Sequence, residues 1–389
     1  MIGISRARTL TGIRSLARIQ CATQGADGVA RTGDRRIAFF SSVTKESHDT
    51  VCRGSLWLKC ADSLGVVSGM SECFHSHGSN LTNADMHVEH SQRVSGLLDN
   101  DKEDVDTFIS RFSFEYPRQM DLESFETSVS KVVGSLEHAE GSLLLHSGRH
   151  VMFQKQDESG VLTDDDASSK VTKRVMRSSG SPRMGVLVSR TEHCLIDLLN
   201  RIRSGDLNVT IPFVISNRNR EGSSGGCTHV RRSLDQLEIP YYHVPHGGRN
   251  RADWEQDIRD IVGTHGERTD FLVLARYMQI LSGDFLRSYN GPIINIHHGL
   301  LPSFKGANPY RQAFDAGVKL IGATSHFVTE DLDEGPIIEQ RIERVSHRDT
   351  IKSFRRKSED LEAMALHEAV RSYTENRVTM VKGRTVIFT

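Results

Sequence analysis

Two hydrophobic patterns follow one another along this chain of 389 residues. In the first part, apolar residues alternate as in strands or recur at helical spacing. Strands are expected at 55–60, 80–88 and 107–115, and helices at 66–77 and 122–133. Gly78 is well placed to end the first helix. The pattern predicts a small ferredoxin-like module over residues 55–135, in βαββαβ order.

From Met184 onward, short apolar runs alternate with helical segments. The runs are 185–189, 210–216, 239–244, 271–275 and 293–296, and the helical segments between them are 192–203, 228–237, 253–264 and 283–288. Such alternation predicts βαβ crossovers and a mostly parallel, buried sheet. We therefore expect an α/β protein whose second, Rossmann-like domain covers residues 183–389, with ligands bound at the carboxyl ends of its strands.

Two further segments lack a globular pattern. Residues 136–182 mix acidic, basic, Ser and Gly residues with little periodicity, which indicates a linker or an insertion. Residues 1–26 contain four arginines and no Asp or Glu, with apolar residues at helical spacing. This composition is typical of a mitochondrial transit peptide, predicted within residues 1–45. Location in the mitochondrial matrix is therefore expected, and a cytoplasmic protein with a disordered basic tail is the alternative.

Composition narrows the classes of partner. The formal net charge is −1 and the isoelectric point is near 7.0, so the broad positive field that nucleic-acid binding needs is missing. The six cysteines form no CxxC pair and have no metal-type spacing to histidines, which indicates reduced thiols. Apolar runs fall short of the roughly 18 to 20 residues that span a bilayer. We expect no nucleic-acid partner and no membrane association.

The chemistry-bearing residues gather near the last predicted parallel strand. Asn295 and His297 stand two residues apart, so strand periodicity points both side chains to one side. Asp333 follows another apolar strand, which is expected to lie beside the first. An amide, an imidazole and a carboxylate are the groups needed to hydrolyse or transfer an acyl group. This set requires no metal.

Several motifs in the same region resemble a known family. NIHHGLLPSFKGANPYRQA, GATSHFV, DLDEGPIIEQ and LARYMQIL are similar to the folate-dependent formyltransferase fold, and in particular to the formyltetrahydrofolate deformylases. The first module resembles an ACT domain. The resemblance implies hydrolysis of 10-formyltetrahydrofolate, a linear amide, to formate and tetrahydrofolate, with the folate as substrate and no permanently bound cofactor.

The resemblance also assigns roles. It implies that Asn295, His297 and Asp333 are catalytic. The folate is expected to contact two segments, which consist of Met278, Gln279, Ile280 and Leu281, and of Thr329, Glu330, Asp331 and Leu332. His298 and His326 are left open, since each could serve the site or be a structural histidine.

Two alternatives to hydrolysis remain. The relatives that formylate glycinamide ribonucleotide carry a glycine-rich phosphate loop after the first strand of this domain, whereas residues 189–195 here contain no glycine. Hydrolysis is therefore favoured over formyl transfer. A non-catalytic folate-binding protein is the other alternative, and the intact catalytic set argues against it.

The ACT resemblance implies regulation by an amino acid and a homo-oligomer. The family's loop usually reads Asp-Arg-Pro-Gly, and this chain has Asp62-Ser63-Leu64-Gly65. Asp62 and Gly65 are therefore weak candidates for effector contacts. A module that serves assembly alone is an equal alternative.

Overall fold

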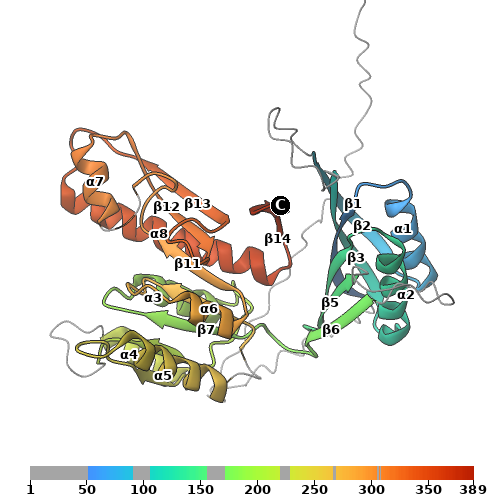
Figure 1. The fold of residues 1–389 in the computed structure, drawn as a ribbon, viewed down its shortest axis with the longest axis horizontal. Helices are drawn as coiled ribbons and strands as arrows, with labels where there is room; N and C mark the ends of the chain where they lie inside the picture. Colours follow the sequence, from blue (N-terminus) through green and yellow to red (C-terminus); the bar gives the residue numbers. More distant parts are fainter. Residues whose placement is uncertain are drawn as a thin grey trace, which may run out of the picture. The chain divides into compact units, whose positions relative to one another are not determined.

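The computed structural model of the chain describes residues 51–90, 106–155, 171–219, 228–265, 269–304, 306 and 308–389. The predicted transit peptide, residues 1–45, lies outside them. The described chain forms two larger sheets and a short two-stranded one. The first larger sheet and its two helices are drawn in blue to green in Figure 1, and the second runs from green to red.

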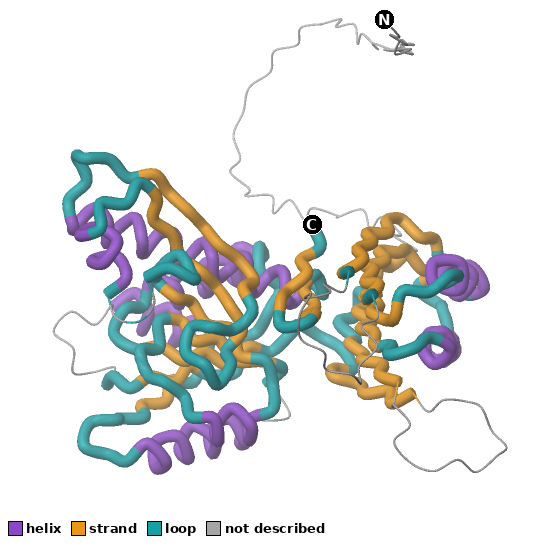
Figure 2. Tube along the Cα trace, turned by 45° about the horizontal axis from the view of Figure 1, so that its top comes forward, coloured by secondary structure: helices purple, strands orange, loops and turns teal. Residues whose placement is uncertain are grey.

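The first sheet is antiparallel, with strand order β2-β3-β1-β4-β5-β6. Its bounds are β1 Val51–Ala61, β2 Asn80–Glu89, β3 Thr107–Pro117, β4 Glu140–Leu145, β5 His150–Lys155 and β6 Val171–Arg177. Helices α1 (Val66–Ser76) and α2 (Leu122–Ser135) pack against it, as Figure 2 shows. Phe74, Phe114 and Phe125 are buried between helices and strands in one apolar core. The predicted βαββαβ order is confirmed by β1 to β4.

The predicted linker or insertion over residues 136–182 is wrong for the part that the structure describes. This stretch contains β4, β5 and β6, which continue the first sheet. Val151 and Phe153 of β5 are fully buried, while β6 is largely exposed because it forms the edge of the sheet. The prediction failed at β6 because this edge strand is largely exposed and shows no apolar alternation, whereas β4 and β5 are interior strands whose short apolar stretches were not recognised.

The second sheet has the strand order β13-β12-β11-β10-β7-β8-β9. The strands are β7 Met184–Val188, β8 Val214–Ser216, β9 Tyr241–His243, β10 Phe271–Ala275, β11 Ile293–His297, β12 Leu320–Phe327 and β13 Ile337–Arg344. Strands β7 to β11 run parallel, and β12 and β13 are antiparallel to their neighbours. The predicted α/β class with a mostly parallel sheet is confirmed.

Helices cover both faces of this sheet. The helices are α3 His193–Ser204, α4 Thr228–Gln236, α5 Arg251–Thr264, α6 Gly283–Tyr289, α7 Pro309–Asp315 and α8 Ile351–Thr374. Side chains of α3, α4, α7 and α8 share one core with the sheet, and those of α5 and α6 share the core on its other face. Strands buried on both faces explain why β7 and β10 are apolar at every position.

The chain ends in the hairpin of β14 (Val378–Val381) and β15 (Arg384–Ile387). Among the residues that the structure describes, none of the helices has the length and apolar character needed to cross a membrane.

Candidate active site

The pairing of β11 with β12 brings the first polar groups together. Asn295 lies opposite His326, and His297 lies opposite Thr324. The Asn295 Nδ2 atom is 3.2 Å from His326 Nε2. His326 Nδ1 lies 2.8 Å from the backbone oxygen of Phe327, so it donates there and leaves Nε2 as the acceptor. His326 therefore fixes the orientation of the Asn295 amide.

Asp333 is held in place by an unusual backbone. Its φ is 57°, in the left-handed region that non-glycine residues rarely adopt. At Gly335, a Cβ would lie 1.7 Å from the carbonyl oxygen of Phe327, so only glycine allows this loop to close against β12. Strained backbone of this kind persists where the surrounding structure enforces it, and it is enriched at functional sites.

The loop delivers Asp333 to the end of β11. Asp333 Oδ2 is 3.2 Å from His297 Nδ1, and Asp333 Oδ1 is 3.9 Å from His326 Nε2. His297 Nε2 is 3.1 Å from the backbone oxygen of Phe304. Each ring nitrogen of His297 thus faces an oxygen acceptor, and a ring that donates to both carries two protons. The predicted meeting of Asn295, His297 and Asp333 is found in the structure.

Burial and neighbouring charge set the protonation states here. Burial raises the pKa of the Asp333 carboxyl, but the hydrogen bond and charge of His297 outweigh this, so its pKa lies below the usual value. Asp333 is therefore a carboxylate near neutral pH. Burial lowers the pKa of His326. Burial and the nearby Arg276 lower the pKa of His298 to about 3. Both histidines are therefore neutral near pH 7.

These side chains line a cavity of about 270 Å³. All eight residues expected to contact the folate surround the same cavity, in the segments 278–281 and 329–332. Met278, Ile280 and Leu332 are more than half exposed, with relative exposures of 53%, 53% and 54%. A cavity with apolar surface and a few converging polar groups is typical of a small-molecule binding site.

Comparison with known proteins agrees with this geometry. A family model described as formyl transferase matches residues 182–370. Formyltetrahydrofolate deformylase 2, mitochondrial, from Arabidopsis thaliana is 41% identical over 335 residues, which cover 85% of each chain. The chain belongs to the formyltetrahydrofolate deformylase family. The deformylase of Synechocystis sp. is 33% identical over 86% of this chain and 98% of the relative.

Solved structures of the deformylase family give the same result. A formyltetrahydrofolate deformylase from Pseudomonas syringae pv. tomato has a TM-score of 0.66 and 33% identity, covering 88% of this chain and 96% of that chain. The enzyme from Burkholderia mallei has a TM-score of 0.64 and 29% identity, covering 87% of this chain and all of that chain. The likeness therefore extends over the antiparallel first module as well as the second sheet.

Some site residues were missed or left open by the sequence. The sequence does not decide the role of His326, which the structure places 2% exposed beside Asn295. Arg276 was not singled out, although it lines the cavity. The pairing partner of Asn295 would have pointed to His326, but strand register is not readable from one sequence.

The two weak effector candidates lie in the first module. Gly65 has a φ of 91° and precedes α1, where it acts as the N-cap without a side-chain cap. The backbone N–H of Asp62 donates to the backbone oxygen of Asp106. Their predicted contact with an effector stays a prediction.

Proposed function

We propose that this chain hydrolyses 10-formyltetrahydrofolate to formate and tetrahydrofolate, with Asn295, His297 and Asp333 as its catalytic residues. The observation that carries the proposal is the 3.2 Å contact between His297 Nδ1 and Asp333 Oδ2, at the end of the strand that also presents Asn295. The names of the relatives support the substrate. The cavity shared by all three residues supports their joint action on one carbonyl.

The chemistry assigns one task to each residue. Water adds to the formyl carbon on N10, and its proton passes to the Asp333 carboxylate. The formyl oxygen becomes an oxyanion that accepts from the remaining N–H of Asn295, whose other N–H faces His326. The C–N10 bond then breaks as N10 takes the proton held by Asp333, and the formic acid released loses its remaining proton to solvent and leaves as formate. General-base assistance of this kind contributes roughly 10² to 10⁴ in rate.

His297 lies between two oxygen acceptors, the Asp333 carboxylate and the Phe304 carbonyl. Its Nδ1 lies 3.2 Å from the Asp333 carboxylate and its Nε2 lies 3.1 Å from the Phe304 oxygen, so a ring with a proton on each nitrogen would place positive charge beside the reacting carbonyl. To donate to the oxyanion, Nε2 has to leave the Phe304 carbonyl when substrate binds. The backbone of Phe304, φ 57°, lies in the left-handed region that non-glycine residues rarely adopt.

The exposed apolar rim suits the ring system of the folate. Met278, Ile280 and Leu332 offer exposed apolar surface at the cavity, and Thr329 and Asp331 add polar groups to the same lining. This division matches a ligand with an aromatic body and a reactive polar centre.

Water is the proposed acceptor because a second-substrate site for a phosphate is not evident in residues 189–195, which lack glycine. The discriminating assay measures formate released by purified protein, with and without glycinamide ribonucleotide. Formate release without the ribonucleotide supports hydrolysis. Formylated ribonucleotide in place of formate would identify a transferase, and binding without turnover would identify an inert folate-binding protein.

We further propose that the protein acts in mitochondria. The arginine-rich start of the chain and the naming of two Arabidopsis thaliana relatives as mitochondrial support this location. Import of the full-length chain into isolated mitochondria, with removal of an N-terminal segment, is the expected result. A chain that stays outside and unprocessed would favour the cytoplasm.

For the first module we propose a role in regulation or assembly through contacts between copies of the chain. The ferredoxin-like order of β1 to β4 supports this role. Sedimentation of the purified protein, with each amino acid in turn, tests it. If the protein is a monomer, and no amino acid changes its mass or its activity, both the regulatory and the assembly role are contradicted.

A further inference from the structure

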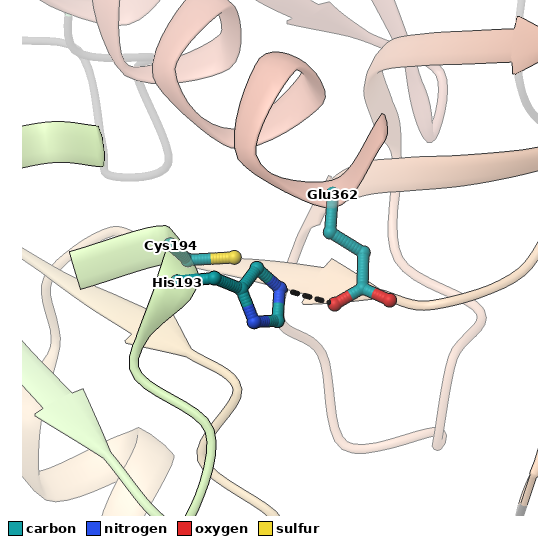
Figure 3. A group of neighbouring side chains, drawn as sticks. All are labelled: His193, Cys194 and Glu362. Atoms are coloured by element: carbon teal, nitrogen blue, oxygen red, sulfur yellow. Dashed lines mark hydrogen bonds and ion pairs between the residues drawn. The ribbon is translucent and has the colours of Figure 1, made fainter. Parts of the chain in front are cut away.

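A polar cluster on α3 and α8 lies next to the catalytic cavity. His193, Cys194 and Glu362 place their ligand-type atoms within 4.8 Å of one another, and Figure 3 shows His193 hydrogen-bonded to Glu362. The set superficially suits a metal ion. Two observations oppose that reading: burial raises the pKa of the Cys194 thiol well above its usual value, and the Arg276 guanidinium already pairs with Glu362. A divalent cation would have to displace the Arg276 guanidinium, which already supplies positive charge to Glu362.

The cluster instead anchors Arg276. The Glu362 side chain is only 2% exposed; its Oε2 is hydrogen-bonded to His193 Nε2 at 2.8 Å and forms an ion pair with Arg276 Nε at 3.2 Å. Arg276 Nε also lies 3.3 Å from Thr191 Oγ1. A buried carboxylate needs such partners, because an unpaired charge in the interior is costly. The guanidinium is thus fixed from the side of α8.

The backbone aims Arg276 at the active site. Leu274 of β10 pairs with Asn295 of β11, and Arg276 directly follows the end of β10 at Ala275. Neighbouring strands lie about 4.8 Å apart, well within the reach of an arginine. Its φ of 64° departs from the strand, and such a conformation in a non-glycine residue is enriched at ligand sites. Arg276 lines the same cavity as Asn295, His297 and Asp333.

One donor of Arg276 is unused within the described residues. Its Nη1 atom is buried and has no hydrogen-bond partner among them. A buried donor of a charged group that lacks an acceptor carries a desolvation penalty, so a ligand that supplies an acceptor is favoured. The neighbouring His298 is not a competing cation, because burial and Arg276 itself lower its pKa to about 3.

We infer that Arg276 forms a subsite for formate, the anionic product, beside the carbonyl-binding site. This rests on the proposed hydrolysis. Formate differs from the formyl group in carrying a full negative charge over two oxygens, which a guanidinium recognises better than a neutral carbonyl. Arg276 is therefore a product-binding residue that receives formate as the C–N10 bond breaks.

The test compares formate inhibition in the wild type and in Arg276→Met/Glu362→Gln. The double variant removes the guanidinium without leaving Glu362 as an unpaired buried charge, so it is expected to fold. Because a hydrogen bond to a charged group contributes about 1.5–3 kcal/mol, the formate inhibition constant should rise at least about tenfold. The KM for 10-formyltetrahydrofolate should change by less than about threefold. Arg355→Met, which alters an exposed ion pair on α8, is the matched control and should behave as wild type.

Two results would overturn the inference. One is a large rise in KM with unchanged formate inhibition, which would mean that Arg276 binds the folate instead. The other is equal inhibition of the wild type by formate at about 100 mM and by sodium chloride at the same ionic strength.

A second readout does not depend on turnover. Broadening of the carbon-13 resonance of labelled formate should occur with the wild type and be lost with the double variant. Broadening without release of formate from 10-formyltetrahydrofolate would support the formate subsite and contradict the proposed hydrolysis. Normal turnover without broadening would support the hydrolysis and contradict the subsite.

Discussion

Replacing Asp333 by Asn tests the centre of the proposed mechanism. The amide keeps the size of the carboxylate, and Asn tolerates the left-handed backbone at this position, φ 57°, as well as Asp does. The variant is therefore expected to fold. It loses the base that takes the proton of water and the negative charge that faces His297 at 3.2 Å.

The expected loss is in kcat. General-base assistance of roughly 10² to 10⁴ corresponds to about 2.7 to 5.4 kcal/mol of transition-state stabilisation. KM should change little, because the folate is expected to contact the rim segments rather than Asp333. Formate release under saturating substrate measures the effect. Asp315→Asn, at an exposed ion pair on α7, is the matched control and should retain wild-type turnover. An Asp333→Asn enzyme within about threefold of wild type would refute the assignment, since that is far below the lower bound for a general base.

The same variant makes a prediction about pH and stability. The folded pKa of Asp333 lies below its usual value of 3.8, so its ionised form stabilises the fold at neutral pH. That contribution is present above the unfolded pKa and is lost as the pH falls through the lower folded value. The wild type should therefore exceed Asp333→Asn in Tm near neutral pH, and the gap should close in acid. A Tm difference between the two proteins that grows as the pH falls would contradict the lowered pKa of Asp333.

Three further substitutions address the neighbouring residues. Asn295→Ala should lower kcat by about 10² to 10³ through loss of an oxyanion donor, measured by formate release, and a loss below about threefold would contradict this role. Gly335→Ala should lower both Tm and kcat, because its Cβ would meet the Phe327 oxygen at 1.7 Å; normal activity would show that the loop does not position Asp333. His298→Gln should leave the pH dependence of kcat unchanged over roughly pH 5 to 8, because a pKa of about 3 keeps His298 neutral there, and a shifted acid limb would contradict that.

Local pattern was sufficient for most elements of the chain. The apolar run at 271–275 became β10 without a change of bounds, and the predicted helix at 122–133 became α2, Leu122–Ser135. Asn295 and His297 were found from strand periodicity alone, because two residues of spacing place both side chains on one side. Asp333 was expected beside them because it follows a second apolar strand, and resemblance to a family added the eight rim residues.

Tertiary structure decided the contacts between distant residues. The pairing of β11 with β12 sets Asn295 against His326, and the burial of Glu362 on α8 anchors Arg276, 86 positions earlier in the chain. Strand register and helix docking are properties of the packed core, and local sequence carries little information about them. The edge strand β6 was missed for the same reason, since its place in the sheet comes from backbone pairing with β5 rather than from apolar side chains. The sequence by itself determined which groups are available for chemistry, and only the fold determined which of them meet.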